Sequence, residues 1–385
     1  MAVLKSSAIE IQTLREKVIL SLRQQGFILD GERIRIPDCT DKDGLRHLHK
    51  EAVKTRLEKS RKGLVTYERK LLTYIADGSD VQPDRIAPRL VEVEPETENE
   101  LLFRYASRHW SIPVSSGYGR RLRFLVFDEH NNKLIGLFGL GDPVFSLAAR
   151  DEWIGWNKEQ RRTKLKYVMD AFLLGAVPPY SDLLCGKLIA MLVASDEVRT
   201  AFKKKYKDRT SLIKQEPSDG RLVLITTTSA LGRSSLYNRV CFNGETVFHS
   251  IGFTAGSGDF HFSNGLYAEF SDFAKNYCTP TAKKSTWGTG FRNRRELVRK
   301  VLMHLGLPSE LIYHQVKREV FAVPLAKNAL VFLNGKHDRV QWYSMPSEEI
   351  FKYFRERWLL GRAERKKRYL DFKASSYRLW TKEES

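Results

Sequence analysis

Hydrophobic positions near the start of the chain follow a helical period. Residues 8–25 carry an apolar stripe with the spacing of an amphipathic helix: Ile9, Ile11, Leu14, Val18 and Leu22. Gly26 follows where a helix C-cap is expected. The stretch FILDGERIRIP then predicts a β-hairpin around Asp30-Gly31, and residues 41–76 predict a charged helical region.

Strand patterns dominate the middle of the chain. RRLRFLVFDEHNNKLIGLFGL predicts two strands that turn at Asn131-Asn132. The unbroken apolar runs YVMDAFLLGAV and RLVLITTTSAL predict buried strands at 168–177 and 221–229, which we expect to be neighbours in one sheet. Between them, residues 182–206 predict one long helix. This order predicts an α/β fold with a mixed sheet.

Three regions are expected from these patterns. Residues 1–90 form an N-terminal helical region with a hairpin, 100–280 a central α/β domain, and 285–385 a basic C-terminal region. The Pro- and Glu-rich stretch PDRIAPRLVEVEPETENE is interpreted as a connector. In the last region REVFAVPLAKNALVFLN is strand-like, and RNRRELVRKVLMHLGLP and RERWLLGRAERKKRYLDFK predict basic helices.

The charge of the chain predicts a binding partner. The chain of 385 residues has 65 Lys and Arg against 46 Asp and Glu, a net charge of +19. Such an excess favours a polyanion, and we expect nucleic acid, DNA more than RNA. The cations expected to bind it lie in clusters: Arg120, Arg121, Arg123, Lys203, Lys204, Arg292, Arg294, Arg295, Lys366 and Lys367. A solvated basic surface is the alternative.

Several classes of protein are disfavoured. The four cysteines form no C-x-x-C pair, and no other metal-ligand spacing is present, so we expect no metal. The start of the chain has no apolar signal core, and no segment is apolar enough to span a membrane. These features predict a cytoplasmic protein without a membrane partner.

The order of elements resembles the acetyltransferase-like (GNAT) core. That resemblance implies an acyl-CoA-like donor whose pyrophosphate lies at the helix after the fourth strand, near Tyr180, Ser181 and Lys187. Free N–H groups at such a helix start favour an anion. The segment GAVPPYSDLLCGKLIA lacks the spacing of a P-loop, and capping by Ser181 or Asp182 is the alternative.

The string RDEWIGW supplies candidate catalytic groups. We expect Asp151 or Glu152 to act as a base, with Arg150 or Arg161 facing an anion. In the favoured version Asp151 and Arg150 deprotonate or orient the acceptor. Trp156 is expected to stack on a base. In the alternative interpretation the string is a strand end whose tryptophans fill the core.

Polar residues directly after the second buried strand predict a substrate site. Its expected members are Arg233, Ser234, Ser235, Asn238, Arg239 and, further on, His261. Tyr237 is expected to be a general acid. The riskiest hypothesis is that one cleft, at the carboxyl edge of the two apolar strands, contains Arg150, Asp151, Tyr180, Ser234, Tyr237 and Asn238.

Long strings identify a family resemblance. GYGRRLRFLVFD, RDEWIGW, VMDAFLLGAVPPYSDLLCGKLIA, TTTSALGRSSLYNRV and IGFTAGSGDFHFSNGLY resemble the DruA family, named after the Druantia anti-phage defence systems. The resemblance implies a role in defence alongside other subunits and carries no catalytic residue. The leading hypothesis is therefore a nucleic-acid-binding defence protein with an acyltransferase-like domain that, if active, would modify a base or nucleotide. The alternative is a non-catalytic module that recognises nucleic acid and recruits other subunits.

Overall fold

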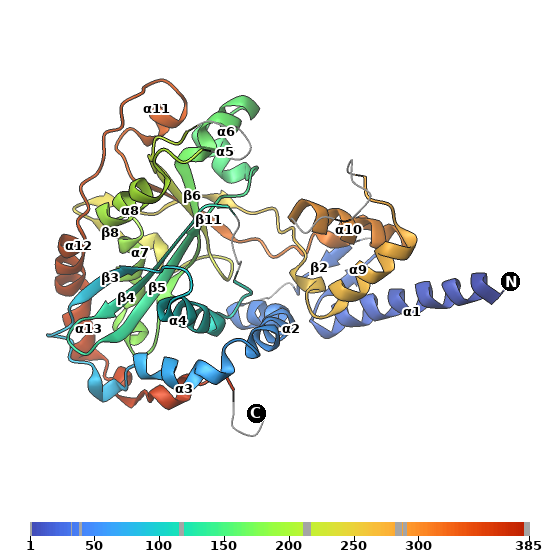
Figure 1. The fold of residues 1–385 in the computed structure, drawn as a ribbon, viewed down its shortest axis with the longest axis horizontal. Coiled ribbons are helices and arrows are strands. Elements are labelled where there is room, and N and C mark those ends of the chain that lie inside the picture. Colours follow the sequence, from blue (N-terminus) through green and yellow to red (C-terminus); the bar gives the residue numbers. More distant parts are fainter. Residues whose placement is uncertain are drawn as a thin grey trace.

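The protein has two lobes joined by a helix (Figure 1). The computed structural model describes residues 2–31, 33–37, 41–114, 119–210, 217–281, 287 and 291–380. A seven-stranded sheet with helices on both faces makes the sheet lobe, and helices α1, α9 and α10 with a short hairpin make the helical lobe. The α/β class predicted from the sequence is confirmed.

The large sheet has the order β10-β11-β7-β6-β5-β4-β3. Its strands are β3 Pro88–Glu92, β4 Arg121–Asp128, β5 Lys133–Gly141, β6 Val168–Ala176, β7 Leu224–Thr228, β10 His249–Phe253 and β11 Glu319–Pro324. Two-stranded pairs are formed by β1 Ile28–Asp30 with β2 Arg33–Arg35, and by β8 Cys241–Phe242 with β9 Glu245–Thr246. All pairs are antiparallel except β6–β7, so the predicted mixed sheet is confirmed.

Helices surround this sheet and build the second lobe. They are α1 Ala2–Gln24, α2 Lys42–Arg61, α3 Glu68–Leu71, α4 Glu98–Ala106, α5 Ala148–Ile154, α6 Lys158–Lys164, α7 Cys185–Leu192, α8 Asp196–Tyr206, α9 Leu266–Tyr277, α10 Phe291–His304, α11 Ala329–Leu333, α12 Ser347–Phe354 and α13 Leu360–Arg365. The long apolar run of the C-terminal region splits into β11 and α11, where only strand was expected.

The two apolar runs form the parallel pair β6–β7, as neighbours. They pair over only three positions, from Val168 opposite Leu224 to Asp170 opposite Thr226. Beyond Asp170, β6 continues with β5 alone and carries an irregularity opposite Gly139 and Leu140. The two strands therefore part toward their carboxyl ends.

The predicted connector before β4 is wrong. Residues 88–92 are the edge strand β3, and α4 begins after Thr97, whose side chain accepts the N–H of Glu100. Pro88 fits the first residue of an edge strand, which can lack an N–H donor. The strand was not predicted because an edge strand tolerates proline and glutamate, two residues that are typical of a connector.

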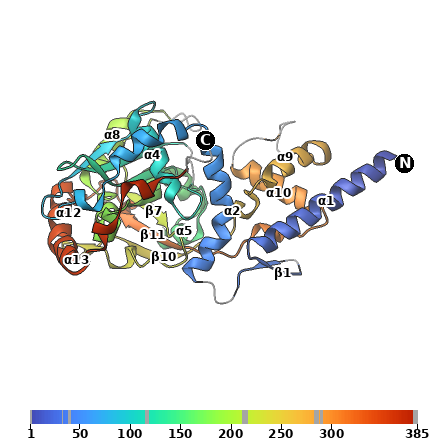
Figure 2. The same cartoon turned by 90° about the horizontal axis from the view of Figure 1, so that it is seen from below.

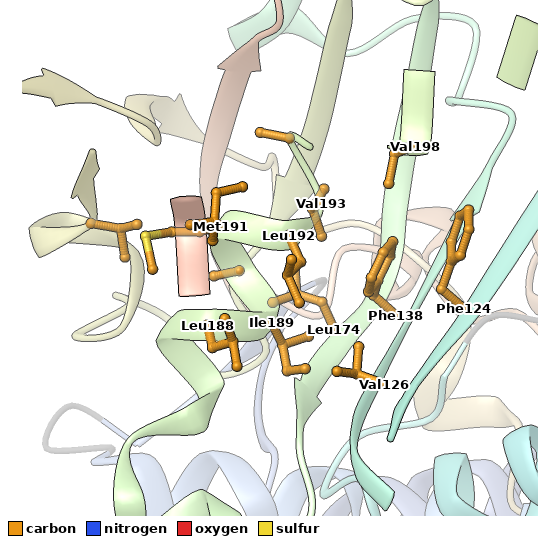
Figure 3. Packing of buried hydrophobic residues seen from close by; sticks show 14 of the residues in the cluster. Phe124, Val126, Phe138, Leu174, Leu188, Ile189, Met191, Leu192, Val193 and Val198 are labelled. Atoms are coloured by element: carbon orange, nitrogen blue, oxygen red, sulfur yellow. The ribbon is translucent and has the colours of Figure 1, made fainter. Parts of the chain in front are cut away.

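The single helix predicted over 182–206 is also wrong, because the chain breaks between α7 and α8. Ser195 is extended there, and the N–H of Asp196 donates to the carbonyl of Met345. Helix α7 packs on the sheet through Leu188, Ile189 and Leu192, opposite Leu174 and Phe138 (Figure 3). Each such buried side chain contributes about 1.5–3 kcal/mol, so this contact is a main part of the core.

The helical lobe combines segments that lie far apart in the sequence. The chain leaves the sheet after β10, forms α9 and α10, and returns as β11. These helices pack against the Leu14, Val18 and Leu22 stripe of α1, which confirms the predicted amphipathic helix. Because β11 lies between β10 and β7 in the large sheet, residues 285–385 contribute to both lobes.

Helix α2 joins the two lobes, and we call it and the surfaces packed on it the junction (Figure 2). Its first half adds Leu45 and Leu48 to the core of the helical lobe. Its second half packs Leu57 against the core below α4 in the sheet lobe. The remaining sides of α2 carry most of its charged residues.

Candidate functional site

The string RDEWIGW forms helix α5 rather than a strand end. Gly155 closes the helix at φ 81°, a left-handed conformation that glycine adopts easily. Arg150 is fully buried and donates to Asp151 Oδ1 from Nε at 2.9 Å and Nη2 at 2.7 Å. Its other bonds hold the carbonyls of Val144 and Phe145, so Arg150 ties a loop to the helix.

Asp151 lacks the free oxygen that a general base needs. Arg150 occupies Oδ1, while Oδ2 accepts from Arg161 Nη1 at 2.9 Å and from the Leu147 N–H at 3.2 Å. Trp156 is buried and donates to the Leu333 carbonyl at 2.9 Å, so it offers no exposed face to a base. The geometry corrects the predicted roles of these residues, because their polar atoms are used inside the fold.

The predicted cofactor position is filled by the protein itself. Tyr180 is fully buried, and its hydroxyl donates to Asp128 Oδ2 at 2.9 Å. The N–H of exposed Ser181 donates to the Val177 carbonyl, and that of Asp182 to the Pro179 carbonyl. These residues do not fit an acyl-CoA-like donor, because the N–H groups expected to bind its phosphate are occupied.

Lys187, expected beside that cofactor, points elsewhere. Its ammonium lies 3.4 Å from the Leu236 carbonyl and 5.3 Å from the centre of the Trp358 ring. Burial lowers its pKa. Lys187 therefore packs between α7 and the C-terminal helices.

Tyr237 lies in the core on one face of the sheet. Its ring stacks on Phe248 at 4.8 Å between centroids, and burial raises its pKa. Tyr237 shares a core cluster with Ile225, whereas Ile154 of α5 packs with Leu224 in another. Neighbouring residues of a strand point to opposite faces, so Tyr237 and Asp151 are on opposite faces and the predicted shared cleft is wrong.

The polar residues around Tyr237 divide into two groups. Ser234 is buried, its N–H donates to Glu319 Oε2 at 3.0 Å, and its hydroxyl accepts the N–H groups of Leu236 and Tyr237. The other predicted members stay exposed: Arg233, Ser235, Asn238 and Arg239. His261 belongs to the helical lobe, where it is buried and bonded through Nε2 to the Leu311 carbonyl at 2.8 Å. A common substrate site is not formed.

Two of the predicted phosphate-binding arginines are held by carboxylates. Arg120 pairs with Asp142 at 2.6 Å and also donates to two main-chain carbonyls. Arg123 pairs with Glu100 at 2.7 Å. The expectation of free cations is therefore wrong for Arg120 and Arg123. Arg121, which lies between them in the sequence, is exposed but also interacts with another part of the chain.

The remaining predicted cations differ in availability. Arg294 pairs with Asp259 and lies 3.6 Å from the Tyr267 ring centre, and Arg295 lies over Tyr313. The side chain of Arg292 is outside the described residues. Among the predicted cations, four are exposed and form no ion pair in the described part of the chain: Lys203, Lys204, Lys366 and Lys367.

Helix α2 is the basic element that the sequence prediction missed. Its 20 residues include seven Lys and Arg and three Asp and Glu. Its exposed lysines, with Lys62 just after its end, form no ion pair within the described residues: Lys42, Lys50, Lys54, Lys59 and Lys62. The helical period places Lys50 and Lys54 on the same side, a signal that was present in the sequence.

Two further groups stand out by their surroundings. Asp170 lies at the last paired position of β6–β7 and accepts from Thr226 Oγ1 at 2.8 Å, and burial raises its pKa to about 6. At the junction, Arg56 and Arg108 line a hollow of about 10 Å³. Neither arginine has an ion pair or a side-chain hydrogen bond to any described residue.

Two absences from the described residues limit the kinds of site. No three His, Cys, Asp or Glu side chains are placed to hold a metal ion within the ranges that the structure describes. In the same ranges, every helix is too short or too polar to cross a membrane.

Comparison with known proteins identifies the family. The family model described as Druantia protein DruA matches residues 39–335. A protein of Escherichia coli (strain UMEA 4076-1) named Druantia protein DruA is 40% identical over 363 residues, which cover 94% of this chain and 90% of that protein. No solved structure matches. Both the family match and the identity show that this chain belongs to the DruA family.

Proposed function

We propose that this protein acts in anti-phage defence as a nucleic-acid-binding module that recruits other defence subunits. Membership of the DruA family supports the defence role. The observation that carries nucleic-acid binding is the basic surface of α2, whose exposed lysines meet no carboxylate in the described chain. Cations that are not neutralised within the protein are free to displace counterions from a phosphate backbone.

The position of α2 suits such a role. It connects the two lobes, so a strand or duplex bound along it contacts both (Figure 2). The rise between Lys50 and Lys54 is about 6 Å along a helix, and both stems can bend toward one backbone. The exposed pairs Lys203–Lys204 and Lys366–Lys367 extend the positive surface over the sheet lobe.

A transferase is the less favoured candidate, although the sheet supports a distant acetyltransferase-like origin. The fourth strand from the β3 edge is β6, and it forms the parallel pair with β7 before the two part. The helical turn after β6 is where that fold would hold a donor. Since its N–H groups donate to Val177 and Pro179, we propose that the domain has lost donor binding.

The test is binding measured by fluorescence anisotropy with labelled duplex DNA, single-stranded DNA and RNA over a salt series. We expect the wild-type chain to bind, with log K falling against log salt by about 0.7–0.9 per phosphate contacted. Lys50→Gln with Lys54→Gln should reduce that slope. The control Lys327→Gln with Lys336→Gln removes the same charge near α11 and should leave it unchanged. Absence of binding at low salt would refute the proposal.

A further inference from the structure

Three arginines from two parts of the chain converge at the junction. Arg56 comes from α2, Arg104 from the end of α4, and Arg108 from the 3-10 turn Ser107–His109 that follows. Burial, and then the charge of Arg108, lowers the pKa of Arg56 to about 10. Burial and the charge of Arg104 lower the pKa of Arg108. Arg108 therefore lies close enough to both Arg56 and Arg104 to repel them.

This cluster has no counter-charge of its own. The side chains of the three arginines form no ion pair or hydrogen bond with the described residues, and Arg108 Nε is buried without a partner. Glu100 interacts electrostatically with Arg104, but its carboxylate already forms an ion pair with Arg123 at 2.7 Å. The excess positive charge is therefore left unbalanced where water is partly excluded.

Unbalanced buried cations are unfavourable for folding. Guanidinium groups removed from water normally gain a carboxylate, as Arg150 does with Asp151. An arrangement that lacks one is expected where an outside anion completes it. Guanidinium forks match phosphate oxygens in shape and donate paired hydrogen bonds to them.

The size of the hollow limits how the anion enters. Arg56 and Arg108 line it together with Val53, Trp110 and Val114, and its volume is about 10 Å³. That is the size of one water-sized sphere, so it admits a single oxygen atom. A phosphate group can present one oxygen here while its other substituents stay outside.

We propose that Arg56, Arg104 and Arg108 form a phosphate-binding site between α2 and the end of α4. Resting on the proposed function, we further infer that the phosphate is one of a nucleic-acid backbone that runs along α2. Lys59 lies three residues after Arg56, on the same side of the helix, so both can contact one bound strand. A free phosphate compound is the other source of the same chemistry, and the test separates the two.

The test compares stability and binding in the full chain. Thermal unfolding is followed without ligand, with pyrophosphate, and with a single-stranded oligonucleotide. Arg108→Gln and Arg56→Gln should unfold at an unchanged or higher temperature without ligand, because each removes a repelling charge. The same variants should bind the oligonucleotide about tenfold more weakly or worse. Arg108→Lys keeps the charge but not the fork, and should recover only part of the affinity.

Arg123→Gln is the matched control. It removes an arginine that is paired with Glu100, so it should lower the unfolding temperature and leave affinity within about twofold. Arg108→Gln and Arg56→Gln variants that lose stability and keep wild-type affinity would overturn the inference while DNA binding stands. Stabilisation by pyrophosphate alone, lost in Arg108→Gln, would keep the phosphate site and reject a nucleic-acid source. If neither ligand stabilises the wild-type chain, the site is refuted.

Discussion

Buried basic groups meet opposite surroundings in the sheet lobe and at the junction. In the sheet lobe, Arg150 contacts Asp151 and Arg123 contacts Glu100. At the junction, burial lowers the pKa of half-buried Arg318, and its guanidinium lies 3.1 Å from His49 Nε2, with no carboxylate within salt-bridge distance in the described chain. Arg56 likewise lacks an acidic partner there. Arg150 and Arg123 are thus neutralised within the described chain, whereas Arg318 and Arg56 meet no carboxylate there.

Paired and unpaired arginines have different effects on the protein: the paired ones stabilise the fold, whereas the unpaired ones leave a surface on which an anion can bind. A paired buried charge fixes the geometry of its neighbours, and losing one partner is costly. An unpaired buried cation lowers the free energy of unfolding unless an anion binds to it. The arginine clusters that are obvious in the sequence belong largely to the first kind, whereas those of the junction belong to the second.

The largest expected effect is a loss of stability in acid that arises at the junction. Burial lowers the pKa of His49 and of His261 to about 4, so both rings are neutral in the folded protein at pH 7. The unfolded chain binds protons on them below about pH 6.5. Their contribution is therefore complete above that pH and is lost as the pH falls toward 4, by about 3 kcal/mol for each ring. Urea unfolding between pH 7 and 4 measures it.

Two variants localise this effect. His49→Gln removes one ring of lowered pKa and should reduce the acid loss by about 3 kcal/mol. Asp170 acts in the opposite direction. Its raised pKa of about 6 stabilises the folded state at low pH, and this stabilisation is lost as the pH rises. Asp170→Asn should therefore steepen the acid loss. A profile that is the same in all three proteins would contradict the assignment to these groups.

Breaking a paired charge in the sheet lobe should come next in size. Asp151→Asn leaves Arg150 and Arg161 without their carboxylate and should lower the free energy of unfolding by about 3–5 kcal/mol at pH 7. Exposed Glu152→Gln, one residue further on, is the control and should change it by less than about 0.5 kcal/mol. Equal effects would mean that the ion pairs do not stabilise α5.

A smaller loss is expected from Tyr180→Phe. This change leaves Asp128 Oδ2 buried without the hydroxyl that donates to it, which should cost about 1–3 kcal/mol in urea unfolding. Tyr67→Phe, at an exposed tyrosine, should be neutral. If Tyr180→Phe keeps full stability but abolishes binding of an acyl-CoA, the cofactor role inferred from the sequence would be restored.

The smallest change is expected at the exposed lysines of the sheet lobe. Lys203→Gln with Lys204→Gln, or Lys366→Gln with Lys367→Gln, should leave the free energy of unfolding within about 0.5 kcal/mol. The salt slope of DNA binding should fall by no more than about 0.7–0.9, one phosphate contact. A larger fall would move the centre of the interface from α2 to the sheet lobe.

Sequence patterns predicted those elements whose burial is set locally. The unbroken apolar run of β6 and the stripe of α1 were recognisable, since each needs only one kind of neighbour. The break at Ser195 was not, because it depends on Met345, 149 residues from the contact at Asp196. A run of apolar residues does not reveal where a distant segment interrupts it.

The candidate site was harder to predict for the same reason. Arg120 and Arg56 are both arginines in basic surroundings, yet one meets Asp142 and the other meets no acid in the described chain. The sequence lists the charges but not their pairing. The spacing of Arg104 and Arg108 shows only that both lie on one side of a helical turn, and Arg56 joins them through tertiary packing.

The place of residues 254–318 between β10 and β11 affects the order in which the protein is assembled during synthesis. Helix α1 emerges from the ribosome before α9 and α10, but its apolar stripe packs against them. Arg15 of α1 donates to the Leu305 carbonyl, 290 residues later. Until those residues are made, α1 keeps Leu14 and Val18 exposed, so the nascent chain presents an amphipathic helix to chaperones for most of its translation.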